Sequence, residues 1–275
     1  MTAESTPATP ATPATPAAPV AGVGSAFPAG PAGPAARVLA QARFEAVTLL
    51  RNGEQLLVAV LLPAAVLIAL VHARSISLGG GRRVDLAVPG VLALCVISSA
   101  FTGQAISTGF DRRYGVLRLL GVTPLGRTGL VLAKALAVLS VIGVQVVVIG
   151  GLGLALGWEP TLRGIPAAVL SLALGTWAFV ALALLLGGTL RAEGVLAVAN
   201  LLWVALLALG GVVIAGTELP ARFAGIVALL PSAALGDSLR AAFVEGRALP
   251  GAWLVLTVWA LVATALARRF FRWSD

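Results

Sequence analysis

The chain has few residues of the kinds that usually carry chemistry. Its 275 residues include one cysteine, Cys95, one histidine, His72, and one lysine, Lys134. A single cysteine excludes an intramolecular disulfide, and a single histidine leaves no convincing member for an HExxH zinc motif or a serine–histidine–aspartate triad. Lys134 lies between two alanines, so it is not a P-loop lysine. We therefore expect no catalytic residue, no cofactor, no metal site and no ATPase motif of its own.

Charge is scarce as well. Charged residues make up 11% of the chain and hydrophobic residues 59%, whereas a soluble domain carries about 25% charge. The mean hydropathy is +1.01, which is typical of an integral membrane protein. A net charge of +8 would suggest nucleic acid for a soluble protein, but the arginines lie mostly in turns between apolar runs, where they orient the chain in a bilayer. We expect no nucleic-acid partner.

Six apolar runs are each long enough to cross a bilayer as a helix of about 20 residues. They lack the alternation of barrel strands, and helices satisfy their own backbone groups in hydrocarbon. The predicted fold class is an all-α polytopic membrane protein with six transmembrane helices. With both termini inside, eleven arginines lie in inside segments and seven outside, so the positive-inside tendency favours an N-in/C-in orientation. The runs lie near residues 55–73, 86–109, 129–156, 165–188, 194–216 and 250–267.

Three further segments complete the domain organisation. Residues 1–35 are rich in Pro, Ala and Thr and are predicted to be a disordered cytoplasmic tail, followed by a membrane domain over 36–275. Residues 36–53 show a polar stripe at helical spacing, which predicts an amphipathic helix in the membrane interface; the alternative is an extension of the first span. Residues 217–249 are too polar to span throughout, and they are predicted to form an external helical hairpin, or else a plain loop.

Polar residues within the apolar runs are costly in a membrane and therefore informative. Serine and threonine hydroxyls there bond to the preceding helical turn, and helix packing explains most of them. Gln104, Gln145 and Asn200 are better candidates for interhelical hydrogen bonds or a wet path. Lys134 is expected to extend its amine to the cytoplasmic surface. No carboxylate lies centrally in any run, so the ion-coupling groups of most secondary transporters are missing.

The segment between the second and third runs is the most distinctive in the chain. Over residues 110–128 it reads FDRRYGVLRLLGVTPLGRT, with four arginines against one aspartate. The positive-inside tendency places this basic, partly amphipathic segment in the cytoplasm, within reach of a soluble partner.

This segment resembles the acidic-basic-x-x-Gly-x-Leu-Arg-x-Leu-x-x-x-Pro motif of type-2 ATP-binding-cassette (ABC) permeases related to drug and antibiotic exporters. The resemblance extends over residues 36–275 and implies a half-transporter that pairs with a second permease subunit, usually a copy of itself, and with separate ATPase subunits. The family usually begins the motif with glutamate and often has a basic residue before the glycine, where this chain has Asp111 and Tyr114. By resemblance, the residues that couple to the ATPase are Asp111, Arg112, Gly115, Leu117, Arg118 and Pro124.

The resemblance also implies that spans two and five face the translocation path or the second subunit. This would place Ser99, Thr102, Gln104 and Asn200 near the path. The implied protein is a multi-pass subunit of a bacterial cytoplasmic (inner or plasma) membrane, in contact with lipid, that exports an amphiphilic, drug-like or lipid-linked cargo. Two alternatives stay open at this point: a secondary transporter or channel, and a membrane anchoring subunit that transports nothing.

Overall fold

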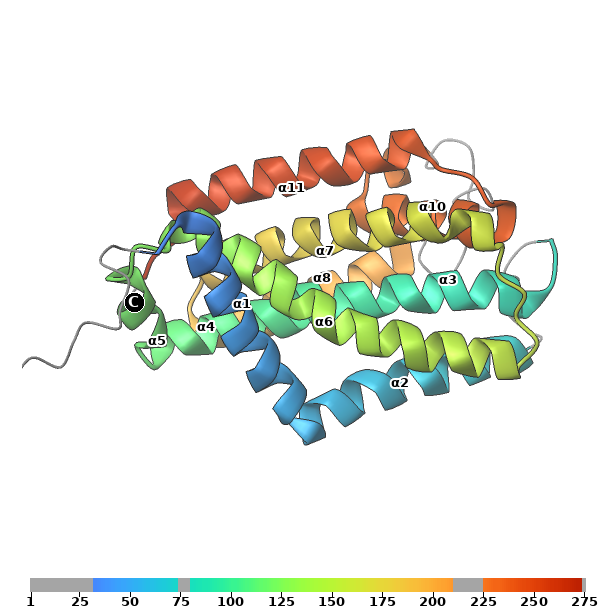
Figure 1. The fold of residues 1–275 in the computed structure, drawn as a ribbon, viewed down its shortest axis with the longest axis horizontal. Coiled ribbons are helices and arrows are strands. Elements are labelled where there is room, and N and C mark those ends of the chain that lie inside the picture. Colours follow the sequence, from blue (N-terminus) through green and yellow to red (C-terminus); the bar gives the residue numbers. More distant parts are fainter. Residues whose placement is uncertain (1–31, 74–79, 210–224, 274–275) are drawn as a thin grey trace, which may run out of the picture. The chain divides into compact units, whose positions relative to one another are not determined.

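The computed structural model describes residues 32–73, 80–209 and 225–273. The described residues form helices and no strand (Figure 1). The helices are α1 (Pro34–Arg51), α2 (Gly53–His72), α3 (Arg83–Val96), the π-helical η1 (Ile97–Gly103), α4 (Gln104–Arg113), α5 (Val116–Gly121), α6 (Gly126–Ala155), the short η2 (Leu162–Gly164), α7 (Ile165–Gly187), α8 (Ala192–Leu209), α10 (Pro231–Glu245) and α11 (Pro250–Phe270).

Among the described residues, five helical stretches are long and apolar enough to cross a membrane. They are Gly53–His72, Arg83–Arg113, Gly126–Ala155, Leu162–Gly187 and Pro250–Phe270. The all-helical membrane class is therefore confirmed for the described residues. The predicted span at 194–216 is described only as α8, a shorter apolar helix, because residues 210–224 lie outside the described ranges. The sixth span and the N-in/C-in orientation stay predictions.

Helix α1 is separate from α2. The break is Asn52, whose side-chain oxygen accepts a hydrogen bond of 3.2 Å from the backbone nitrogen of Gln55 and so begins α2. α1 packs across α6 and buries Ala42 against the bundle (Figure 1). Helix α1 begins at Pro34, inside the predicted tail, and residues 1–31 of that tail lie outside the described ranges.

The core is built around α7, which contacts α3, α4, α6, α8, α10 and α11. Phe179 of α7 is fully buried, and its ring lies 6.3 Å from that of Phe101 in η1. A Cβ added at Gly187 would lie 2.8 Å from the carbonyl oxygen of Ala105. The glycine therefore allows α7 to approach α4 more closely than any other residue would.

The region predicted to be an external hairpin contains a buried helix. In α10, Leu235, Leu239 and Ala242 are fully buried, and the helix packs against α3, α7 and α11. Residues 231–245 are therefore not a plain loop. Residues 217–224 of the predicted hairpin lie outside the described ranges.

Candidate functional site

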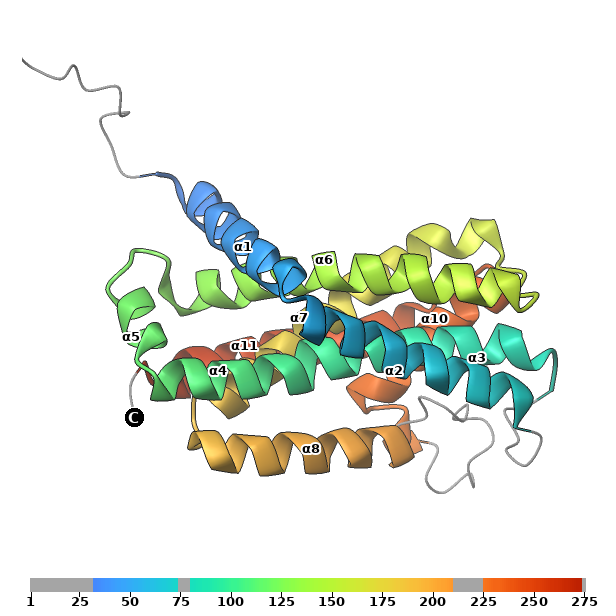
Figure 2. The same ribbon diagram turned by 90° about the horizontal axis from the view of Figure 1, so that it is seen from below.

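The basic segment after α4 forms a sharp turn and a short helix at one end of the bundle (Figure 2). α4 ends at Arg113, and Gly115 takes a left-handed backbone conformation with φ of +78° before α5 begins. Glycine adopts this conformation without the steric cost that a Cβ would bring. The turn that directs α5 away from the axis of α4 therefore explains why position 115 is a glycine.

Several contacts hold the α5 segment against the bundle. The side chain of Leu117, which belongs to α5, is fully buried. Arg112, which is 4% exposed, donates a hydrogen bond to the carbonyl oxygen of Leu190 in the connection between α7 and α8. The ring of Trp273, after α11, packs over Gly121. These contacts tie the segment to the connection between α7 and α8 and to the residues that follow α11.

The other side of this segment is exposed and apolar. Tyr114 is 72% exposed, Leu119 71% and Val122 85%, with the exposed cation Arg118 among them. Residues 118, 119 and 122 lie within one helical turn of each other and share a side. We call Tyr114, Arg118, Leu119 and Val122 the α5 face. Exposed apolar side chains around a cation are typical of a surface that binds another protein.

Helix α1 lies next to the turn that follows α5. Arg37 of α1 donates a hydrogen bond of 2.9 Å to the carbonyl oxygen of Pro124, in the turn between α5 and α6. The two segments therefore border the same end of the bundle, although 87 residues separate these two positions.

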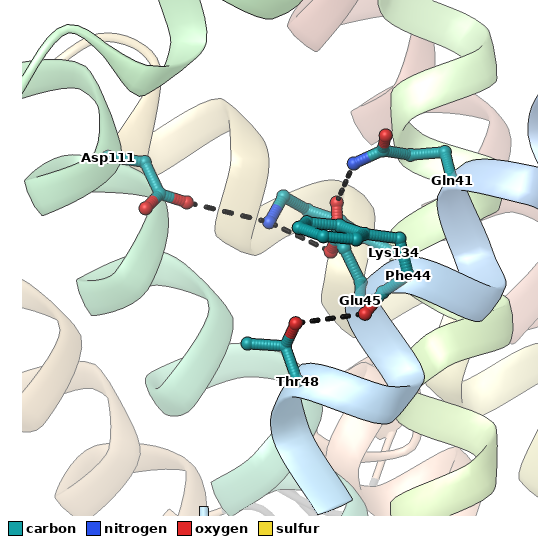
Figure 3. Close-up of polar contacts among 6 residues, drawn as sticks. All are labelled: Gln41, Phe44, Glu45, Thr48, Asp111 and Lys134. Atoms are coloured by element: carbon teal, nitrogen blue, oxygen red, sulfur yellow. Dashed lines mark hydrogen bonds and ion pairs between the residues drawn. The ribbon is translucent and has the colours of Figure 1, made fainter. Parts of the chain in front are cut away.

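A buried charge cluster joins α1, α4 and α6 (Figure 3). The Nζ atom of Lys134 in α6 lies 3.1 Å from Oε2 of Glu45 in α1 and 3.7 Å from Oδ2 of Asp111 in α4. Gln41 donates a hydrogen bond of 2.8 Å to the other oxygen of Glu45. The lysine side chain is 5% exposed. The expectation that Lys134 extends to the cytoplasmic surface is therefore wrong, because two carboxylates from distant segments neutralise it inside the protein.

The structure divides the six residues predicted to couple to an ATPase into two groups. Asp111, Arg112 and Leu117 point into the protein and hold the segment in place, and Gly115 makes the turn. Arg118 and Pro124 are exposed. The sequence analysis did not single out Leu119 and Val122. Their spacing could have indicated them, because residues two and five positions after Leu117 lie on a different side of a helix from Leu117.

The four predicted path residues do not form one cluster. Ser99 and Gln104 line a groove of about 590 Å³ between α2, η1, α4 and α6. Thr102 lies in η1, and its hydroxyl has no partner among the described residues. Asn200 is exposed on α8, a helix that runs alongside α4 (Figure 2).

A buried glutamine is bonded to two residues that line the groove. Gln145 of α6 is fully buried, and its Nε2 atom donates to the carbonyl oxygen of Ala59 at 2.7 Å and to Oγ of Ser99 at 3.2 Å. The expected interhelical role of Gln145 is confirmed by these two bonds. Ser99 belongs to η1, whose π-helical turns widen the backbone, a feature often found at functional sites.

Comparison with protein families decides the wider identity of this arrangement. The family described as "ABC-2 family transporter protein" matches residues 80–269, well over half of the chain. The chain belongs to the ABC-2 family. A search of curated proteins finds no match. The matched region contains η1, the α5 face and the helices that anchor it, whereas α1 and α2 precede it. ABC-2 proteins are the membrane components of ABC transporters, so membership implies association with an ABC ATPase subunit.

Proposed function

We propose that this ABC-2 protein is the permease subunit of an exporter. It moves an amphiphilic, drug-like or lipid-linked cargo across the cytoplasmic membrane, and a separate subunit that docks on the α5 face hydrolyses the ATP. The observation that carries the proposal is the contrast within one short segment: an exposed apolar and basic face, with Leu119 and Val122 exposed, over anchors at Leu117 and Arg112 that are buried.

The anchors explain how ATPase movement would reach the membrane helices. α5 follows directly from α4 through the Gly115 turn, and α4 continues through η1 into α3. A docked ATPase that closes on ATP would push α5 as a rigid body and bias the helices between two arrangements. Arg112, bonded to the carbonyl oxygen of Leu190, would carry the same movement to the connection before α8.

Helix α1 would form a second part of the docking surface. It borders the α5 segment through the bond from Arg37 to Pro124, and Lys134 ties it to α4 and α6. An amphipathic helix held in this way would move with the coupling segment while lying in the membrane interface.

A second copy of the permease would complete the translocation path. α8 exposes a row of apolar side chains, including Leu201 and Val204, next to Asn200. A lipid-facing or subunit-facing surface would be apolar in this way, and a homodimer with spans two and five facing the path would bring Ser99, Thr102, Gln104 and Asn200 toward it. This arrangement also assumes six spans with both termini inside.

The docking proposal is tested by purifying the tagged chain from its native membranes in mild detergent and identifying what copurifies by mass spectrometry. We expect a P-loop ATPase and ATP hydrolysis in the eluate. Arg118→Glu should reduce ATPase recovery by at least several-fold, because it reverses the charge at the centre of the dock. Arg163→Glu changes another exposed arginine, in η2 at the opposite end of α7, and is the matched control that should change nothing.

Two outcomes would contradict the proposal. Recovery of the folded chain with no ATPase, repeated after crosslinking, would favour a secondary transporter or an anchoring subunit. Recovery of an ATPase at the same level with Arg118→Glu would place the dock elsewhere on the protein.

A further inference from the structure

A basic pocket of about 490 Å³ lies at the end of the bundle where α4 and α11 finish and α8 begins (Figure 2). Three of its arginines stand at the ends of candidate membrane spans. Arg113 ends one span, Arg191 lies four residues after another, and Arg272 lies two residues after a third. Residues at the ends of spans lie at the depth of the lipid headgroups. We call this pocket the span-end pocket.

The lining of the span-end pocket carries a large excess of positive charge. Its charged residues among those described are four arginines and one glutamate: Arg112, Arg113, Arg191, Arg272 and Glu193. The glutamate is compensated, because Arg113 forms an ion pair with it. Arg191 and Arg272 are exposed, and their guanidinium groups form no ion pair with a described residue. Cations that line one pocket repel each other and attract an anion to it.

Backbone contacts hold the walls of the span-end pocket together. The backbone nitrogen of Arg272 donates a hydrogen bond of 3.0 Å to the carbonyl oxygen of Gly188, and the side chain of Arg112 donates to the carbonyl oxygen of Leu190. The segment after α11 and the end of α4 are therefore both fixed to the connection between α7 and α8. Guanidinium groups held in this way suit phosphate, because their planar forks can donate two hydrogen bonds to its oxygens.

Apolar side chains beside the pocket indicate which phosphate compound it takes. Leu196, one helical turn after Glu193 in α8, is 43% exposed, and Phe270, two residues before Arg272, is 51% exposed. A phosphate at headgroup depth next to exposed apolar surface matches a phospholipid. The arginines repel the cationic group of a choline lipid, so the favoured lipid has a net negative charge, as basic pockets between membrane helices prefer.

We propose that the span-end pocket binds the phosphate group of an anionic phospholipid. Arg191 and Arg272 donate hydrogen bonds to the phosphate oxygens, and the acyl chains lie along Leu196 and Phe270. The bound lipid connects the end of α4, the start of α8 and the segment after α11. This inference does not depend on the proposed export function.

The test is native mass spectrometry of the full chain, delipidated in detergent and without an ATPase. It is titrated separately with phosphatidylglycerol and with phosphatidylcholine that has the same acyl chains. We expect one phosphatidylglycerol to bind at least about tenfold more tightly than phosphatidylcholine, since each basic side chain near a lipid headgroup contributes roughly fivefold. Phosphatidylglycerol should also raise the Tm of the chain, because a ligand of the folded state stabilises it.

Two variants assign the effect to the pocket. Arg191→Gln and Arg272→Gln should each weaken phosphatidylglycerol binding about fivefold and leave phosphatidylcholine binding unchanged. Arg269→Gln is the matched control. This arginine is exposed in the last turn of α11, three residues before Arg272, but it does not line the pocket. Its replacement should leave both affinities unchanged.

Equal affinities for the two lipids would overturn the inference. So would an equal loss of phosphatidylglycerol binding in Arg269→Gln, which would mean diffuse attraction to the whole basic end. Displacement of the lipid by an equal concentration of soluble glycerophosphoglycerol would mean a site for free anions and not for a lipid.

A protein occupant would overturn the inference as well. It would be shown if Arg191→Gln and Arg272→Gln reduced ATPase recovery in the pull-down while lipid binding stayed normal. Because the lipid titration contains no ATPase, failure of lipid binding leaves the docking proposal for the α5 face intact.

Discussion

The buried charge cluster gives the sharpest stability prediction. Lys134→Met removes the amine that lies 3.1 Å from Glu45 and 3.7 Å from Asp111, and it leaves two carboxylates beside an apolar side chain. The side chain of Glu45 is 13% exposed and that of Asp111 32%, so solvent compensates the first much less than the second. Removing one member of a buried ion pair costs about 3–5 kcal/mol, because the remaining charge stays uncompensated.

The assay is thermal unfolding of the purified chain in one detergent at one pH. A loss of this size corresponds to a drop in Tm on the order of 10 °C for a domain of this length. The triple variant Glu45→Gln, Asp111→Asn, Lys134→Met removes all three charges together and should recover most of that loss, since neutral replacement of a complete buried ion cluster is often close to neutral. Glu159→Gln, which breaks the exposed ion pair with Arg82, is the control and should leave Tm unchanged.

Two results would refute this reasoning. An unchanged Tm for Lys134→Met would mean that the charges are solvated and not buried. A triple variant that is as unstable as the single one would mean that packing of the lysine stem, and not charge, stabilises the junction of α1, α4 and α6.

Two more predictions concern the α5 segment. Gly115→Ala places a Cβ on a backbone with φ of +78°, which should lower stability by about 1–2 kcal/mol and also lower ATP-dependent transport, because α5 is misdirected. The control is Gly81→Ala, at φ of +127° and outside the α5 segment, which should lower Tm by a comparable amount without affecting transport. Equal transport losses in the two variants would contradict the role of the turn. Leu117→Ala removes a fully buried side chain and should lower the free energy of unfolding by about 2–5 kcal/mol. Leu119→Ala changes a side chain that is 71% exposed, so it should leave Tm unchanged and weaken ATPase association in the pull-down. The reverse pattern would mean that the wrong side of α5 has been assigned to the partner.

Much of the fold followed from local patterns. A helix in hydrocarbon satisfies its own backbone groups, so a run of about 20 apolar residues is enough to predict it. The break at Asn52 could also be predicted locally, because asparagine often begins a helix and a glycine follows it here. The buried helix α10 was harder to predict, because short amphipathic pieces around Pro231 fit a surface hairpin, a loop or a packed helix equally well until the surfaces of α3, α7 and α11 are present to cover them.

In the candidate site, too, some features could be predicted from local sequence and others depended on tertiary packing. The sequence alone determined the membrane class, the basic character of residues 110–128 and the family motif, because charge distribution and short motifs are local properties of the chain. Only the tertiary structure decided which polar residues meet. Lys134 lies 89 residues from Glu45 yet forms an ion pair with it, Gln145 bonds to Ala59 and Ser99, and the Oε1 atom of Gln104 has no partner among the described residues. Such contacts depend on how helices cross, and the crossing is set by packing between segments far apart in the chain, which no local pattern contains.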